Sequence, residues 1–156
     1  MTNQPPKRTW QYDALEAFLG EWRAEGTSYG GTDQSGSDPK ANGESWGSRL
    51  RAYWHTGSFF MVQDERAVIA GRAFDTLEVM GVNPDSGDYF ARTFENHGYY
   101  RDYRMVREGD VWTTVGETER AHITFEDNGR TQRIVWEWKP GDQWLPLCDR
   151  IAMRTG

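Results

Sequence analysis

The spacing of apolar residues changes near Gly20, from a helical period to an alternating one. Apolar side chains before this point recur three and four residues apart, as on one face of a helix: Leu15, Phe18 and Leu19. Asp13 is the expected N-cap of this helix, Glu16 follows it three residues later, and Gly20 is the expected stop. The pattern therefore predicts one short helix over residues 12–19.

After Gly20 the period is two residues. Trp22 and Ala24 fall on one face of the segment, whereas Arg23 and Glu25 fall on the other. This alternation predicts a strand with one solvent-exposed face and one buried face. We expect Trp22 to pack against the helix as a core residue, with the flanking charges in solvent.

Nine further segments read as strands, because runs of β-branched and aromatic residues alternate with glycine-rich turn signals. They cover residues 48–54, 59–69, 77–82, 89–94, 99–106, 111–117, 121–126, 132–138 and 144–153. Short connections favour antiparallel neighbours, and a meander of this length must close or stack to remove its edges. The sequence thus predicts an all-β fold, a single antiparallel meander barrel of about ten strands with the short helix plugging one end.

A barrel of about ten strands should leave a cavity, because eight strands are already wide enough to hold their own side chains. We place an N-terminal arm at residues 1–11 and one barrel domain at residues 12–156. The glycine-rich and serine-rich segment 30–43 is a loop, and either a lid or disorder fits its composition.

Composition limits the partners. Of 156 residues, 18 are basic and 24 acidic, and the net charge of −6 does not favour a nucleic acid or an anionic membrane as partner. The single Cys148 cannot form an intramolecular disulfide, and the first residues contain no apolar segment, so a cytoplasmic protein is expected. The eight tryptophans are large rings that are costly to expose, so we expect them in the core or in the wall of a pocket.

Five motifs occur in an order that resembles a known group of proteins: FLGEWRAEG, WHTGSFFMVQ, GVNPDSGDYFARTFENHG, GETERAHITFEDNG and WEWKPGDQWLPL. The first is similar to the Gly-x-Trp opening of lipocalin-like and nitrobindin-like barrels, and all five resemble a bacterial family of small barrels of unknown function. The resemblance implies a calycin-type, fatty-acid-binding-protein-like barrel without implying an activity. Nitrobindins hold haem through a histidine near the C-terminus, but WLPLCDRIAMRTG contains none. We therefore expect no haem and no other cofactor.

The residues around His97 are the best candidates for a ligand site, because a polar tip among aromatic rings is typical of pocket linings. Arg101 and Tyr103 share one face of their strand and Arg104 lies on the other, so only one of the two arginines can face the lumen. An inward arginine beside tyrosine would hold a carboxylate. The full set of expected ligand-binding residues is Tyr53, His55, His97, Arg101, Tyr103, Arg104, Trp136 and Trp138.

The leading hypothesis is that the lumen binds a small, partly apolar molecule. If an arginine faces the lumen, this molecule also carries an anionic group. A cofactor-independent cyclase, isomerase or hydrolase is the first alternative, with His97 or His55 as general base beside Asp102 or Glu137. An interaction module that forms a homodimer through an exposed edge or aromatic patch is the second. No metal site is expected, because the three histidines form no metal-binding motif.

Overall fold

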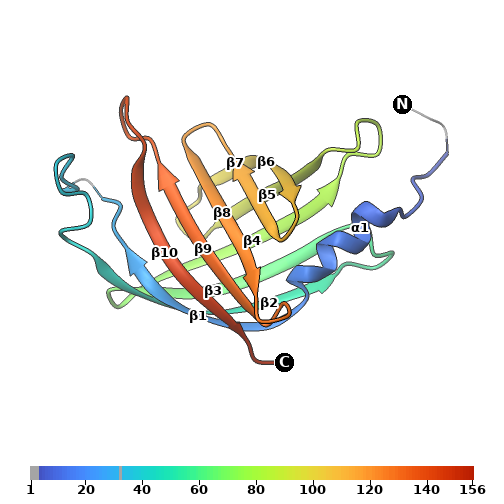
Figure 1. Ribbon diagram of the computed structural model, residues 1–156, viewed down its shortest axis with the longest axis horizontal. Helices are drawn as coiled ribbons and strands as arrows, with labels where there is room; N and C mark the ends of the chain where they lie inside the picture. The colour runs from blue at the N-terminus through green and yellow to red at the C-terminus, as the bar shows by residue number, and fades with distance from the viewer. Residues whose placement is uncertain (1–3, 32) are drawn as a thin grey trace.

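The computed structural model describes residues 4–31 and 33–156 and forms a closed ten-stranded antiparallel barrel (Figure 1). Each strand pairs with its neighbours in sequence, and β1 also pairs with β10 to close the barrel. The strands are β1 (Gly20–Ser28), β2 (Glu44–Trp54), β3 (Met61–Ile69), β4 (Arg72–Val82), β5 (Tyr89–Glu95), β6 (Tyr100–Glu108), β7 (Val111–Val115), β8 (Glu119–Glu126), β9 (Thr131–Trp138) and β10 (Leu145–Arg154). The all-β meander barrel predicted from the sequence is confirmed.

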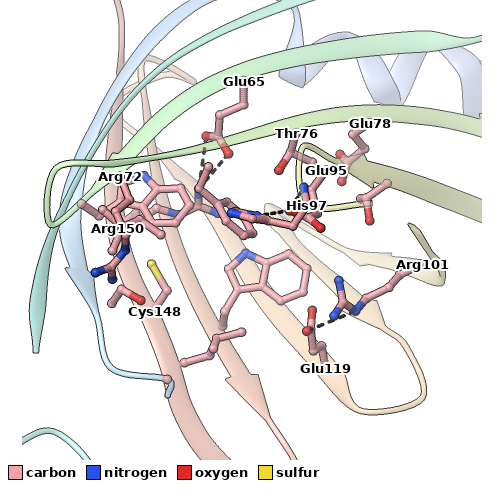
Figure 2. A pocket seen from close by; sticks show the side chains of 18 of the residues that line it. Glu65, Arg72, Thr76, Glu78, Glu95, His97, Arg101, Glu119, Cys148 and Arg150 are labelled. Carbon is pink, nitrogen blue, oxygen red and sulfur yellow. Dashed lines mark hydrogen bonds and ion pairs between the residues drawn. The ribbon is translucent and has the colours of Figure 1, made fainter. Parts of the chain in front are cut away.

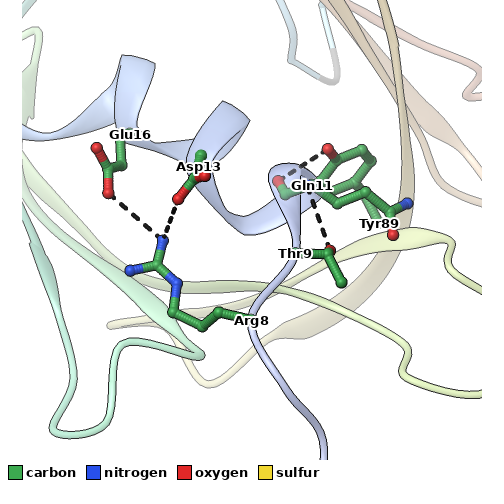
Figure 3. A network of polar contacts seen from close by, with 6 residues as sticks. All are labelled: Arg8, Thr9, Gln11, Asp13, Glu16 and Tyr89. Carbon is green, nitrogen blue, oxygen red and sulfur yellow. Dashed lines mark hydrogen bonds and ion pairs between the residues drawn. The ribbon is translucent and has the colours of Figure 1, made fainter.

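The single helical segment begins earlier than its apolar spacing predicts. It consists of α1 (Trp10–Ala14) followed by the 3₁₀ turn η1 (Leu15–Phe18). The N-cap is Thr9, whose hydroxyl accepts a hydrogen bond from the Gln11 N–H, and not Asp13. The Asp13 carboxylate instead pairs at 3.0 Å with Arg8, which precedes the helix, and so it does not cap the helix (Figure 3). No helix among the described residues is long and apolar enough to cross a membrane.

The helical segment fills one end of the barrel, which we call the closed end. Leu15 and Phe18 are fully buried, and the Phe18 ring packs edge-on against Trp112. Tyr89 at the start of β5 donates a hydrogen bond to the Gln11 carbonyl at 2.8 Å and fastens the plug to the wall (Figure 3). Apolar side chains therefore fill the lumen at this end, and the cavity described below lies toward the other end.

Trp22 has the core position that the sequence predicts. It is 1% exposed, and its indole N–H donates to the Phe18 carbonyl at 3.0 Å. The Arg154 guanidinium from the last strand lies 4.3 Å from the Trp22 ring centre and donates to the carbonyls of Leu19 and Ala17. These contacts join the plug, the first strand and the last strand at the closed end.

The opposite, open end is formed by the connections β1–β2, β3–β4, β5–β6, β7–β8 and β9–β10. The long loop between β1 and β2 is folded against its rim, where Gln34 is the central contact. The Gln34 amide donates to the Pro146 carbonyl at 2.7 Å and accepts a hydrogen bond from the Trp138 indole at 2.7 Å. This loop is therefore tied to β9 and β10 at the rim.

A candidate ligand pocket at the open end

A cavity of about 370 Å³ enters the barrel from the open end. Alternation along the strands decides which side chains face it: on β4, Thr76, Glu78 and Met80 point inward. The register places Glu78 opposite Gln63 of β3 and places Thr76 opposite Glu65. The pocket walls also carry aromatic rings from three strands: Trp46, Phe74 and Trp136.

Among the described residues, the lining contains five glutamates but only three arginines. Figure 2 labels all three arginines, with Glu65, Glu78, Glu95 and Glu119. Each arginine has a glutamate partner: Arg72 with Glu44 at 3.0 Å, Arg101 with Glu119 at 3.3 Å, and Arg150 with Glu65 at 3.1 Å. The positive charges of the lining are thus already neutralised by neighbouring carboxylates.

The pair between Glu65 and Arg150 is the most buried of the three, with the two side chains 15% and 10% exposed. Both Glu65 oxygens lie 3.1 Å from one guanidinium nitrogen, and the Ser48 hydroxyl donates to the same carboxylate. The guanidinium also lies 4.4 Å from the centre of the Trp46 ring. These contacts hold Arg150 in place against the wall.

Glu95 and His97 form a second fixed group, at the turn between β5 and β6. The His97 ring lies 2.6 Å from Glu95 Oε2, and the backbone N–H groups of His97 and Tyr99 donate to the same carboxylate. Burial acts to raise the Glu95 pKa, but these hydrogen bonds outweigh it and hold that pKa below its ordinary value. Glu95 therefore fixes the turn that carries His97 over the pocket.

Glu78 differs from the other glutamates of the pocket. Its hydrogen-bond partner is neutral: the Gln63 amide donates to Glu78 Oε1 at 2.6 Å, and no cation among the described residues pairs with it. Burial raises the Glu78 pKa from 4.5 to about 7, and the negative charge of Glu65 adds to this, while Gln63 and Arg150 oppose it. A pKa near 7 leaves this carboxyl partly protonated at neutral pH.

Tyr103 and Cys148 complete the inner wall. The Tyr103 hydroxyl donates to Glu119 at 2.8 Å, and burial together with this carboxylate raises the Tyr103 pKa. Burial also raises the pKa of the Cys148 thiol to about 11, which keeps it protonated at neutral pH. Both groups are therefore neutral, and neither supplies a charge to the pocket.

Four of the eight residues expected from the sequence line the pocket: His97, Arg101, Tyr103 and Trp136. Arg104 and Tyr53 lie on the outer face of their strands, and His55 lies in the turn after β2, at the closed end. Trp138 lies at the rim, where it binds Gln34.

The carboxylates expected beside a catalytic histidine are also on the outer face. Asp102 pairs with Arg92 at 2.9 Å, and Glu137 pairs with Arg120 at 2.8 Å. The carboxylate that does contact a histidine of the pocket is Glu95. Within the described part of the chain, no group of three or more His, Cys, Asp or Glu residues is arranged to hold a metal ion.

Sequence reasoning missed Glu65, Glu78 and Arg150. A signal was present, because in LEVMGV the single glutamate has the same period-two face as the methionine two residues later. A charged residue that alternates in phase with core residues must face the interior of a barrel.

A scan against models of protein families finds no match for this chain, and a search of curated proteins finds none either. The resemblance to lipocalin-like and nitrobindin-like barrels stays a prediction.

Proposed function

We propose that this protein binds a small, partly apolar molecule in the open-end pocket. The observation that carries the proposal is the cavity of about 370 Å³, in which aromatic walls surround a few fixed polar groups. Ligand sites of proteins combine these two features, and their volumes fall in roughly the range of 300 to 1,000 Å³. The closed end contributes by sealing the barrel, so that a ligand enters from one side only.

The test is a titration with N-phenyl-1-naphthylamine, a neutral fluorophore that brightens in apolar surroundings. Thr93 lines the pocket and Arg92, its neighbour, points outward and is exposed. Thr93→Trp should fill the cavity and weaken binding by about tenfold or more, a loss of about 1.4 kcal/mol. Arg92→Trp adds the same ring outside and should leave binding unchanged. If the wild-type protein does not bind the fluorophore, or if both variants bind it equally well, the proposal is wrong.

One observation supports the alternative of a cofactor-independent enzyme, and it concerns a carboxyl group instead of a histidine. A general acid or base works best when its pKa is close to the working pH, and the Glu78 pKa is about 7. Such an enzyme would show a pH profile with an inflection near 7 that Glu78→Gln removes. A turnover whose rate is the same in Glu78→Gln excludes this role.

A further inference from the structure

We infer that the pocket is specific for an aromatic or alkyl amine, whose ammonium group binds Glu78 while its apolar part lies between the aromatic walls. This inference rests on the proposed function and names the class of ligand. It begins from the charges of the lining, where glutamates outnumber arginines.

The arginines of the lining are poorly suited to an anionic ligand. Arg72, Arg101 and Arg150 already pair with glutamates, whose negative charges reduce the attraction of each arginine for an anion. Arg150 Nε has no hydrogen-bond partner, but it is buried in the wall and gives a ligand atom no access. An anion would also add a negative charge to a lining that has an excess of them.

Glu78, by contrast, lacks what an amine supplies. Buried carboxylates are normally paired with a cation, and Glu78 has only the neutral Gln63 amide among the described residues. An ammonium group would donate charge-assisted hydrogen bonds to this carboxylate and favour its ionised form. The apolar part of the ligand would meet Trp46, Phe74 and Trp136, and the faces of such rings attract cations.

The charged groups that act on Glu78 decide how binding depends on pH. Glu65 on β3 disfavours the ionised carboxylate and Arg150 on β10 favours it, whereas Tyr103 on β6 stays protonated and carries no charge. Since burial keeps the carboxyl half protonated near pH 7, an amine must displace a proton to bind. Affinity for an amine should therefore fall about tenfold between pH 8 and pH 6, with release of protons to the buffer.

The experiment compares three ligands that share an indole ring and a two-carbon chain: tryptamine, tryptophol and indole-3-propionate. Calorimetry at pH 7.5 should give tryptamine the highest affinity, roughly tenfold or more above the alcohol and the carboxylate. Glu78→Gln keeps the acceptor for Gln63 but loses the charge, and should abolish the preference for tryptamine. Glu25→Gln removes a carboxylate from the outer face of β1 and serves as control. Repeating the titrations in two buffers of different ionisation enthalpy measures the released protons.

The outcomes separate this inference from the proposed function. Equal affinity for the three ligands, tighter binding of indole-3-propionate, or a tryptamine preference that survives in Glu78→Gln overturns the inference while binding of the neutral fluorophore stands. If neither the fluorophore nor any of the three indoles binds, the proposed function itself fails. The wild-type pH dependence needs no variant, so a folding defect in Glu78→Gln cannot hide the answer.

Discussion

Replacement of Glu78 by glutamine should stabilise the protein at alkaline pH and leave its stability unchanged in acid. In the folded state the Glu78 pKa is about 7, against an ordinary value of 4.5. Below about pH 4.5 the carboxyl is protonated in the folded and the unfolded chain, so it contributes no difference. As the pH rises from 4.5 to 7, the unfolded chain loses this proton first, and the free energy of unfolding falls.

The size of the effect follows from the pKa difference. Each unit corresponds to about 1.4 kcal/mol, so the wild-type protein should lose about 3 kcal/mol relative to Glu78→Gln across this range. For a domain of this size, that loss corresponds to roughly 6 to 12 °C in melting temperature. The glutamine still accepts the hydrogen bond from Gln63, so packing is conserved.

The assay is urea unfolding followed by tryptophan fluorescence at pH 5 and pH 8, for the wild-type protein, Glu78→Gln and the outer-face control Glu25→Gln. Taking the difference between wild type and variant at each pH cancels the other ionisable groups. The advantage of Glu78→Gln should be small at pH 5 and reach about 3 kcal/mol at pH 8. Parallel stability curves for wild type and Glu78→Gln would show that burial does not perturb this carboxyl, and the reasoning on the pocket would lose its basis.

Two further predictions concern the plug and the closing strand. Leu15→Ala should destabilise the protein by about 2 to 5 kcal/mol in urea unfolding, because Leu15 is fully buried. The control is Trp10→Ala in the same helical segment, which should change stability by less than about 0.5 kcal/mol because Trp10 is 70% exposed. Equal losses in the two variants would contradict the role of the helical segment as a plug. Hemin added to the protein should keep a free-hemin-like absorption spectrum, since β10 contains no histidine and its Cys148 thiol is protonated, and a sharp stoichiometric Soret band would refute this.

The period of two residues was enough to predict the barrel, but it left the choice of face open on several strands. Between residues 99 and 106 both faces carry an arginine and a tyrosine, so local pattern alone could not place Arg101 inside and Arg104 outside. Cross-strand pairing decides the matter, because Tyr103 lies opposite the buried Ala91 and Met105 opposite the buried Tyr89.

The polar groups of the pocket were harder to predict, since each depends on a partner distant in sequence. Arg150 pairs with Glu65 across 85 residues, and neither segment shows that the other will meet it. Glu78 was predictable as an inward residue from its phase with Met80, but its lack of a cation partner among the described residues is a property of the assembled lumen. The helix start was missed because Thr9 caps it, while Asp13 pairs with Arg8 instead.

The pairing of β1 with β10 has a consequence for the order in which this chain can fold during synthesis. The first strand is made early and can pair with β2 as soon as that strand is made, but its other edge pairs with Ala152 and Arg154 of β10, the last of the ten strands to be made. Until then the edge of β1 exposes unpaired backbone groups, the kind of template that recruits strands of other nascent chains. Arg154 also donates a hydrogen bond to the Leu19 carbonyl and stacks on Trp22. The helical plug and the β1–β10 pairing are therefore completed in one late step. We therefore expect the ribosome-bound chain to remain sensitive to protease until β10 has left the exit tunnel.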